Sequence, residues 1–430
     1  MNTASGSQKL LPSLGLLALV ASCFNCTVGG GIFRLPQSVY ALAGRASIVV
    51  YVLCFAVMLC VAGVFIIVGR TIRTSGGPYA YVKPVLGEFT GYLSGVLLWF
   101  LATFAFASVS NAYAHFAGML LPGETGFFGE AVILAMSLTA LALFNVRGAK
   151  LGGGISTLMA LIKILPLLLL FFSGLGSLSA ENLAIPPELP IDSIARAAMV
   201  LIFAFTGVES ALIPSGEIDQ PERNLPRALI ASSILVLVLY LGVHSVSQSV
   251  LGDDLGRPGI APLAESAGLL LGPIGGKILA LGAVLSTLGY LSAMTLSLPR
   301  SLLAFAEDGF LPKRLAEVSS QTQAPVMAIW TQVGIVYLLA VSSQFEKLAV
   351  LANLSAILMY GICSIAAVIL LKHQGKKKLM WIPVLAIGMM GFLLTSVTPT
   401  EWLSVGALLA VSSVLFLRGK AHSPTRHPIN

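Results

Sequence analysis

Long apolar runs separated by short polar segments recur along the whole chain. Most of them reach roughly 18 residues or more, which is long enough for an α-helix to cross the hydrocarbon core of a bilayer. The first, third and eighth runs are longer than a bilayer requires, so we expect them to tilt, bend or break. The pattern predicts twelve membrane spans, at approximately residues 12–43, 47–69, 86–120, 130–146, 153–177, 194–213, 228–250, 273–305, 325–342, 348–371, 379–397 and 401–417.

Composition agrees with an integral membrane protein. Of the 430 residues, 57% are hydrophobic and 10% are charged, whereas about 25% are charged in an ordinary soluble domain. These values exclude a soluble enzyme, a nucleic-acid-binding protein and a disordered chain. No soluble domain fits between the predicted spans, so the sequence predicts a single polytopic membrane domain over residues 1–430.

The distribution of basic residues predicts the orientation in the membrane. Lysine and arginine concentrate in the cytosolic loops of membrane proteins. If the N-terminus is cytosolic, most of the 25 Lys and Arg residues fall in cytosolic segments. We therefore expect both termini in the cytoplasm and the chain in a bacterial inner (plasma) membrane or its equivalent. The net charge of +7 then reflects topology and not a nucleic-acid partner.

Three adjacent glycines interrupt the first predicted span, in the segment Thr27-Val28-Gly29-Gly30-Gly31-Ile32-Phe33. Each glycine costs a helix about 1 kcal/mol relative to alanine, and backbone groups freed in lipid must find other partners. One interpretation is that the helix stops and restarts, so that the restarted half directs bare N–H groups at an anionic group. The alternative is close helix packing through small residues. The glycines alone favour neither.

The sixth predicted span carries a similar interruption, because it contains Phe203-Ala204-Phe205-Thr206-Gly207-Val208-Glu209-Ser210 and then Pro214. The two interrupted spans occupy corresponding positions in two halves of five spans each. Paired interruptions of this kind are typical of transporters that bind a solute near the bilayer midplane, between inverted repeats. Since five is an odd number, the second half is inverted relative to the first. The pair therefore favours a break in the first span over simple packing.

Five short motifs run through nearly the whole chain in a fixed order. They are residues 29–36 (Gly-Gly-Gly-Ile-Phe-Arg-Leu-Pro), 75–81 (Ser-Gly-Gly-Pro-Tyr-Ala-Tyr), 205–210 (Phe-Thr-Gly-Val-Glu-Ser), 221–228 (Pro-Glu-Arg-Asn-Leu-Pro-Arg-Ala) and 304–312 (Ala-Phe-Ala-Glu-Asp-Gly-Phe-Leu-Pro). Together they resemble the amino acid–polyamine–organocation (APC) superfamily of transporters. The resemblance implies an all-α, LeuT-like membrane fold, with inverted five-helix repeats at 12–177 and 194–371 and two further helices within 379–417.

The resemblance also implies where a substrate binds. In this family, backbone N–H groups at the first interruption hold the substrate carboxylate, and carbonyls at the sixth-span interruption hold its α-amino group. The electrostatics agree, because a zwitterion carries opposite charges about 3 Å apart and opposed ends of broken helices carry opposite partial charges. The matching positions are Gly29, Gly30, Gly31 and Ile32 for the carboxylate and Phe203, Ala204 and Phe205 for the amino group, with Thr27 included in the predicted substrate site.

Four further positions are predicted to surround the substrate side chain. Leu101, Ala102 and Phe106 in the third span and Met294 in the eighth match pocket positions of the family's arginine–agmatine exchangers, which have a polar amide in place of Phe106 and a tryptophan in place of Met294. An apolar lining suits an aliphatic, aromatic or methionine side chain, because a cationic one would go unpaired. The alternative for each residue is ordinary helix packing. Phe203 is predicted to cover the ligand as an aromatic gate.

Two ionisable residues lie within predicted spans. Burying a lysine in mid-membrane costs roughly 2.5–3.5 kcal/mol, so a functional role is the default for Lys163, with snorkelling to the interface as the alternative. The resemblance implies that Lys163 takes the place of a sodium ion between the first and eighth helices, and we hypothesise that it carries a coupled proton. Glu209 matches a carboxylate of the family's inward pathway; the alternative is a hydrogen bond that braces the interruption.

These observations predict a secondary active transporter of amino acids, and no enzyme. The favoured substrate is a neutral L-amino acid, moved by proton-coupled symport or exchange with alternating access. The partners are the substrate, the bilayer and protons; no metal spacing, nucleotide loop or nucleophile constellation indicates a cofactor. One alternative is an exchanger or exporter of cationic amino acids or polyamines. An alternative of another class is a membrane amino acid receptor that does not transport.

Overall fold

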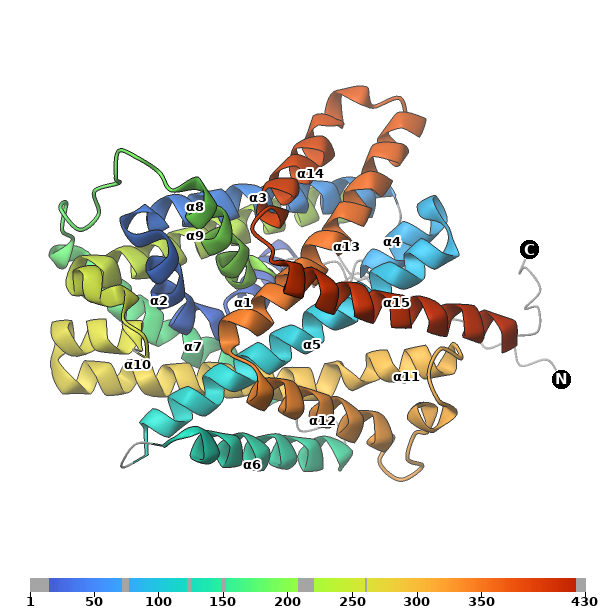
Figure 1. Ribbon diagram of the computed structural model, residues 1–430, viewed down its shortest axis with the longest axis horizontal. Coiled ribbons are helices and arrows are strands. Elements are labelled where there is room, and N and C mark those ends of the chain that lie inside the picture. Colours follow the sequence, from blue (N-terminus) through green and yellow to red (C-terminus); the bar gives the residue numbers. More distant parts are fainter. Residues whose placement is uncertain are drawn as a thin grey trace.

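The computed structural model describes residues 15–71, 77–121, 125–147, 152–207, 220–259 and 261–422, and all regular structure in these ranges is helical (Figure 1). Helices labelled η have 3-10 geometry. In the first half of the chain the helices are α1 (Leu16–Thr27), α2 (Gly31–Ala43), η1 (Gly44–Ala46), α3 (Ser47–Thr71), α4 (Gly77–Leu86), α5 (Glu88–Met119), α6 (Phe127–Val146), α7 (Gly152–Gly174) and η3 (Leu175–Ser177).

The second half continues the helical pattern to the end of the described chain. Its helices are α8 (Ile191–Leu201), η4 (Ile202–Phe205), α9 (Pro221–Leu251), η7 (Gly252–Gly256), α10 (Pro262–Ser297), α11 (Pro299–Glu307), η8 (Lys313–Ala316), α12 (Val326–Ser342), α13 (Phe345–His373), η9 (Lys377–Leu379), α14 (Trp381–Leu394) and α15 (Pro399–His422).

The first predicted span is broken at its glycines. Helix α1 ends at Thr27 and α2 begins at Gly31, so Val28, Gly29 and Gly30 lie outside regular helix. Val28 has extended backbone angles, with φ −74° and ψ 92°. We call this segment the first break. The paired interruptions in the sequence favoured a break over close packing at these glycines, and the structure has the break.

The sixth predicted span also stops being an α-helix in its middle. Helix α8 gives way to one 3-10 turn, η4, after which Thr206 is extended and Gly207 has a φ of 115° that favours glycine. Residues 208–219, including Glu209, lie outside the described residues. The described part of this span therefore ends at the predicted interruption.

The other two long spans behave differently from each other. Helix α5 is continuous over its 32 residues and runs obliquely to α6 and α12 (Figure 1). Helix α10 bends sharply at Gly272, whose φ is 74°, just before Pro273. It then ends at Ser297, and Pro299 opens α11. The predicted span 273–305 thus corresponds to the second part of α10 joined to α11.

The described residues contain eight helical stretches that are long and apolar enough to cross a membrane, together with shorter apolar helices at Lys163–Ser177 and Val326–Ser342. The protein is therefore an all-helical membrane protein with about eight candidate spans. Helices α1 and α8 do not qualify by themselves, because both end at an interruption after 12 and 11 residues. The predicted total of twelve spans remains a prediction.

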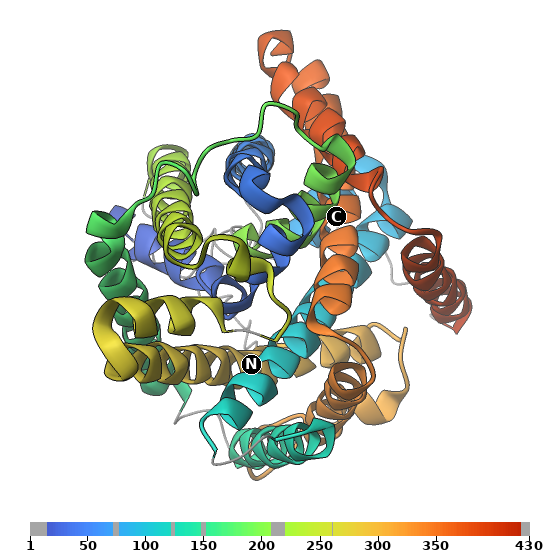
Figure 2. The same cartoon turned by 60° about the vertical axis from the view of Figure 1, so that its left-hand side comes forward.

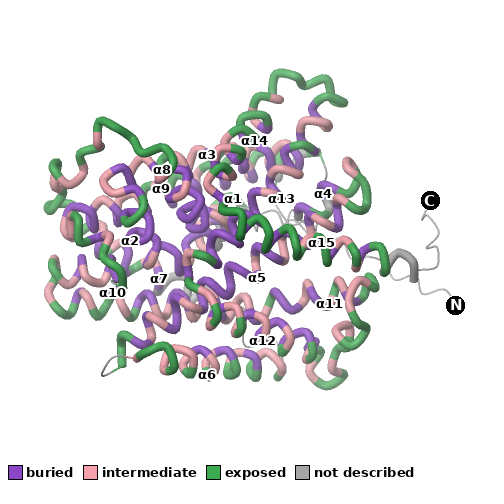
Figure 3. Tube along the Cα trace, in the orientation of Figure 1, coloured by how far each residue is buried: buried purple, intermediate pink, exposed green. Residues whose placement is uncertain are grey.

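The buried residues gather in the middle of the bundle (Figure 3). There α5 packs along α13, while α3 contacts α8, α9 and α13. Helix α14 and the adjoining end of α13 project from the bundle in both ribbon views (Figures 1 and 2). Large apolar side chains on the periphery are exposed, among them Phe128, Met136 and Leu403. This distribution is expected for a surface in contact with lipid, because lipid tails are as apolar as these side chains and their exposure carries no hydrophobic cost.

Candidate functional site

A cavity of about 470 Å³ lies against the first break. Its walls come from the end of α1, the break itself, α5, α7, η4 and α10, and it reaches the junction of α10 and α11 at Leu298 and Ser301. We call it the central cavity. Its volume falls in the range of small-molecule sites, which are concave, mostly apolar and supplied with a few placed polar groups.

Side chains from two other helices satisfy the carbonyls at the end of α1. The last carbonyls of any α-helix lack partners within the helix. The Val28 N–H donates to the Phe24 oxygen at 2.9 Å, Lys163 Nζ donates to the Asn25 oxygen at 2.6 Å, and the Tyr240 hydroxyl donates to the Thr27 oxygen at 3.1 Å. A buried carbonyl left unpaired costs about 1–3 kcal/mol. Lys163 and Tyr240 therefore stabilise a helix end that lipid would not tolerate.

The start of α2 is left open toward the cavity. Its N-cap residue, Gly30, makes no side-chain capping bond, and Gly29, Gly30 and Gly31 all line the central cavity. A helix N-terminus with bare N–H groups and a positive dipole end binds anionic groups. A Cβ at position 30 would lie 2.5 Å from Cγ2 of Thr287 on α10, so any other residue there would have to displace that side chain.

The end of η4 also lines the cavity, through Phe203 and Ala204. The Thr206 N–H donates to the Ile202 oxygen at 3.1 Å, and the Thr206 hydroxyl donates to the Phe203 oxygen at 2.8 Å. This helix end carries a partial negative charge. The cavity lining therefore includes both a positive and a negative helix end, which suits a solute that carries both charges.

An aromatic pair separates the central cavity from a second cavity. Phe203 lines the central cavity, and its ring meets that of Phe345 edge to face, with centroids 5.9 Å apart. Phe345 in turn lines the second cavity, of about 340 Å³. We call this the polar cavity, because its other walls include Arg34, His115 and Glu130. The pair forms the partition between the two.

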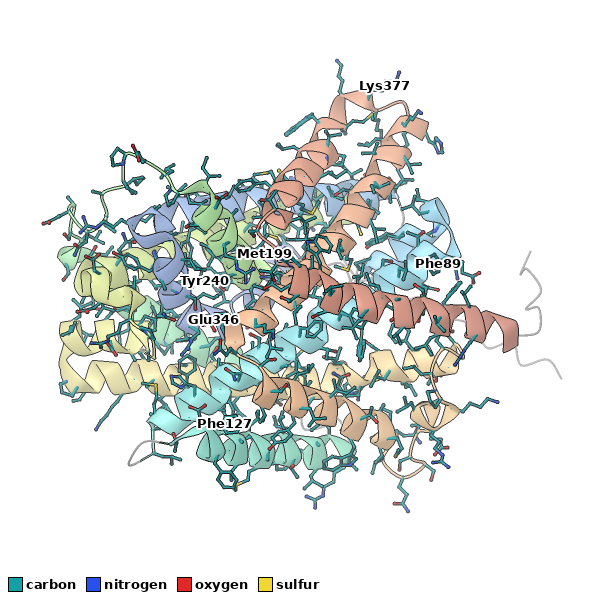
Figure 4. All side chains as sticks on the ribbon, viewed as in Figure 1. Phe89, Phe127, Met199, Tyr240, Glu346 and Lys377 are labelled. Carbon is teal, nitrogen blue, oxygen red and sulfur yellow. The ribbon has the colours of Figure 1, made fainter. Side chains whose placement is uncertain are left out.

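An ion pair and two hydrogen bonds link the walls of the polar cavity. Arg34 Nε on α2 lies 3.6 Å from Oε1 of Glu346 on α13, and the Ser38 hydroxyl donates to the same oxygen at 2.9 Å. Glu346 is labelled in Figure 4. His115 Nδ1 lies 3.1 Å from Oε1 of Glu130. These contacts join α2 to α13 and α5 to α6 on the far side of the aromatic partition.

The central cavity brings together most of the residues predicted to form the site. Three predicted residues, Ile32, Phe106 and Phe205, are buried but are not part of its lining. A fourth, Glu209, lies outside the described residues. The roles of all of them stay predictions. The predicted residues that line the cavity are Thr27, Gly29, Gly30, Gly31, Leu101, Ala102, Lys163, Phe203, Ala204 and Met294.

The sequence reasoning missed several polar residues of the lining. Ser286, Tyr290 and Ser297 on α10 share the cavity with Met294, and their spacing of about one and two helical turns is a signal that could have found them. Asn25 was also missed. Its side-chain oxygen and the Ser286 hydroxyl are buried atoms without a hydrogen-bond partner in the described part of the chain. Polar atoms in this state are available to a bound solute or water.

The chain is similar in sequence to known transporters. The profile of the amino acid permease family matches residues 14–428. The serine/threonine exchanger SteT of Bacillus subtilis is 27% identical over 96% of this chain and 96% of its own length. The methylthioribose transporter of the same organism is 24% identical, with 98% and 96% covered. Its branched-chain amino acid permease BcaP is 25% identical, with 86% and 83% covered.

Proposed function

The chain belongs to the amino acid permease family of the APC superfamily, a family of transporters and not of enzymes, and from this we propose that it is a secondary active transporter of neutral L-amino acids. It moves them by proton-coupled symport or by exchange, with alternating access. The observation that supports this proposal is the central cavity, a solute-sized space lined by both the open N-terminus of α2 and the end of η4.

The character of the cavity lining supports a neutral side chain. Its walls are mainly apolar, with Leu101, Ala102 and Met294 among them, and Lys163 is the charged residue in the lining formed by the described residues. A cationic substrate side chain would find no carboxylate in this part of the structure, and burying it unpaired would be costly. The names of two relatives agree, since SteT exchanges serine and threonine and BcaP takes branched-chain amino acids.

Binding of the two charged ends follows from the helix ends. The substrate carboxylate accepts hydrogen bonds from backbone N–H groups at Gly29, Gly30, Gly31 and Ile32, and the amino group donates to carbonyls at Phe203, Ala204 and Phe205. Charge-assisted hydrogen bonds contribute roughly 1.5–3 kcal/mol each. Three or four of them, less the ordering costs, reach the roughly 4–8 kcal/mol of millimolar to micromolar binding.

Coupling depends on Lys163 and Glu209 in this proposal. Lys163 exchanges its proton as the first break moves, because its ammonium group holds the last turn of α1. Glu209 serves the inward pathway. The Phe203–Phe345 pair closes the central cavity on the side of the polar cavity. The surrounding architecture is the five-plus-five inverted repeat with twelve spans, with both termini in the cytoplasm of a bacterial inner membrane.

Counterflow of radiolabelled amino acids into proteoliposomes tests the function. The panel contains serine, threonine, leucine, methionine, arginine, putrescine and methylthioribose, each at two pH values and with or without sodium. We expect trans-stimulated uptake of neutral L-amino acids that depends on pH and not on sodium. Uptake confined to arginine and putrescine, or to methylthioribose, would contradict the substrate class. Ligand-dependent thermal stabilisation without uptake of any compound would indicate a receptor.

A further inference from the structure

Asn353 on α13 is a polar residue in the interior of the bundle. It is fully buried, at 0% exposure, and its chain neighbours Ala352 and Leu354 are buried as well. It lines neither the central nor the polar cavity in the described part of the chain, so a solute there does not touch it. A polar side chain inside a membrane helix is costly, and a specific role is therefore the first interpretation to test.

The amide of Asn353 contacts the last turn of α8. Its Nδ2 donates to the backbone oxygen of Met199 at 2.7 Å and to that of Val200 at 3.4 Å. Figure 4 labels Met199 in the interior of the bundle. Helix α8 ends at Leu201, where η4 begins, and the last carbonyls of an α-helix lack partners within that helix. Asn353 therefore supplies the end of α8 with a donor from another helix.

This contact has the same geometry along the chain as the contact of Lys163 with α1. Lys163 Nζ donates to the oxygen of Asn25, which lies two residues before α1 ends at Thr27. Met199 likewise lies two residues before α8 ends. In the proposed five-plus-five architecture, α7 and α13 are the fifth spans of their repeats and occupy corresponding positions. Each interrupted helix is thus held at the same place by the fifth span of its own repeat.

The two contacts differ in their chemistry. Lys163 donates from an ammonium group, which can lose a proton, whereas an asparagine amide donates without carrying a charge. The Oδ1 atom of Asn353 is buried and has no hydrogen-bond partner among the described residues. Such an atom destabilises the fold, so good packing alone does not account for an asparagine here. Its Nδ2 contact with α8 does.

We propose that Asn353 is a positioning residue that holds the end of α8 and thereby keeps the amine-binding carbonyls of η4 in place. This inference rests on the proposed function, because it concerns how that site is held. Residues Phe203 and Ala204 of η4 directly follow the held turn and line the central cavity. A small displacement of a binding group lowers affinity strongly. Loss of the contact should therefore weaken binding of the substrate amino group and leave carboxylate binding at the first break intact.

Asn353→Thr removes the contact without emptying the position. Threonine is close to asparagine in volume, and its hydroxyl can bond to a carbonyl of its own helix, as Ser355 on α13 does at 2.9 Å. Asn111 on α5 offers a matched control. Its Nδ2 also donates to two carbonyls at a helix end, those of Ala340 and Ser343 at the end of α12, at 3.1 and 3.2 Å. Asn111→Thr thus deletes the same kind of contact outside the lining of the central cavity.

The experiment measures counterflow of the best neutral substrate in the presence of two competing ligands, its 2-hydroxy analogue and its carboxamide. We expect Asn353→Thr to raise KM about tenfold, which corresponds to about 1.4 kcal/mol, while kcat changes less. The ratio of the inhibition constants of the 2-hydroxy analogue and the amino acid should fall toward one. The same ratio for the carboxamide should keep its wild-type value, and the pH profile should keep its shape, because Lys163 is untouched.

The control separates positioning of η4 from a general loss of stability. Asn111→Thr should lower the unfolding temperature and leave both ratios unchanged. Equal falls of both ratios in Asn353→Thr, an unchanged 2-hydroxy ratio in the folded variant, or the same fall in Asn111→Thr would each overturn the inference. If Asn353→Thr does not fold, the smaller substitution Asn353→Ser, whose hydroxyl bonds to its own helix in the same way, is tested against the same expectations.

Hydrogen exchange provides a readout that does not depend on transport. The peptide that covers η4 includes the Thr206 N–H, which donates to the Ile202 oxygen at 3.1 Å. Its amides should exchange faster in Asn353→Thr than in the wild type and in Asn111→Thr, and equal exchange in all three overturns the inference. Absence of amino acid uptake by the wild type would contradict the proposed function alone, and the exchange result would still test the role of Asn353.

Discussion

Lys163 Nζ on α7 lies 2.6 Å from the backbone oxygen of Asn25 in the last turn of α1. The two residues are 138 positions apart in the chain, and both line the central cavity. Lys163 is 9% exposed. An ammonium group at this place holds the end of α1 by a charge-assisted hydrogen bond, which is a stronger contact than a neutral one. Loss of its proton would weaken this hold on the helix end beside the central cavity.

Replacement of Lys163 should therefore reduce transport and remove its pH dependence. We expect Lys163→Ala to lower counterflow by at least about tenfold, because the Asn25 carbonyl then lacks a donor whose bond contributes roughly 1.5–3 kcal/mol. Rates at two pH values give the measurement. Lys277→Ala on α10, which removes an exposed lysine, is the control. Normal transport by Lys163→Ala, with an unaltered pH response, would show that this lysine does not carry the coupled proton.

A side chain at position 30 should destabilise the first break. A Cβ at Gly30 would lie 2.5 Å from Thr287 Cγ2 and 3.0 Å from Val109 Cγ1. We expect Gly30→Ala to lower thermal stability by about 1–3 kcal/mol, as overpacking usually does, and to reduce transport.

A substitution of Thr287, the residue nearest to the new Cβ, should partly restore the stability of Gly30→Ala. Thr287→Ser removes the methyl group nearest to the new Cβ but keeps the hydroxyl that bonds to the Ala283 oxygen at 2.7 Å. The double variant Gly30→Ala/Thr287→Ser should therefore recover part of the lost stability, and Thr287→Ser alone should behave like the wild type. If the second substitution gives no recovery, the clash with Thr287 is not the cause of the loss.

The sequence predicted the helix interruptions better than the contacts that support them. Adjacent glycines and a mid-span glycine are local signals, because a residue without a Cβ changes the backbone cost at its own position. The positions of the first break and of the end of η4 could be predicted for that reason. Tyr240 and Phe345 carry no such local signal. A tyrosine in an apolar helix resembles any other interior aromatic until the fold places a carbonyl of another helix beside its hydroxyl.

The position of Phe106 relative to the cavity also could not be predicted from the sequence. Helix α5 is apolar on nearly every face, so its hydrophobic pattern does not show which face adjoins the cavity. Leu101 and Ala102 line the cavity, whereas Phe106 is buried at 0% exposure outside the lining. On α10, by contrast, polar residues at helical spacing mark the cavity face, and Ser286 and Tyr290 could have been predicted from it.

The aromatic partition should control access to the central cavity. Phe345 stands between the polar cavity and Phe203. In a variant that lacks the native cysteines, Ala105→Cys places a thiol on the central cavity. A membrane-impermeant thiol reagent is then added from the side of the polar cavity. We expect Phe345→Ala to raise its rate of reaction with Ala105→Cys about tenfold, because loss of the ring opens about the volume of a buried phenyl group.

The substitution Phe104→Ala is the control for a general loosening of the core. Phe104 on α5 is buried at 5% exposure and lies in the wall of neither cavity. Phe104→Ala should leave the labelling rate near that of the parent. Equal acceleration by Phe104→Ala and Phe345→Ala would mean that the pair does not act as a partition.

A bidentate ion pair joins the last described helix to the bundle and predicts a stability effect. Arg196 on α8 donates to the two carboxylate oxygens of Glu401 on α15, at 2.9 and 2.7 Å. The Thr398 N–H also donates to this carboxylate, at 2.8 Å. The Glu401 side chain is 6% exposed and that of Arg196 is 30% exposed, so solvent screens the pair only in part. We expect Glu401→Gln to lower stability in detergent by about 1–3 kcal/mol, because it leaves a largely buried guanidinium without its counter-charge.

Thermal unfolding of matched variants measures that effect. The Arg257–Glu265 pair, whose side chains are 59% and 36% exposed, provides the control, and Glu265→Gln should change stability by less than about 1 kcal/mol. Removal of both charges in Arg196→Met/Glu401→Leu should recover part of the loss, because neither partner then remains unpaired. The KM of the transported amino acid should stay the same in Glu401→Gln, since neither Arg196 nor Glu401 lines the central cavity. Equal unfolding temperatures for Glu401→Gln and Glu265→Gln would show that α15 does not depend on this ion pair.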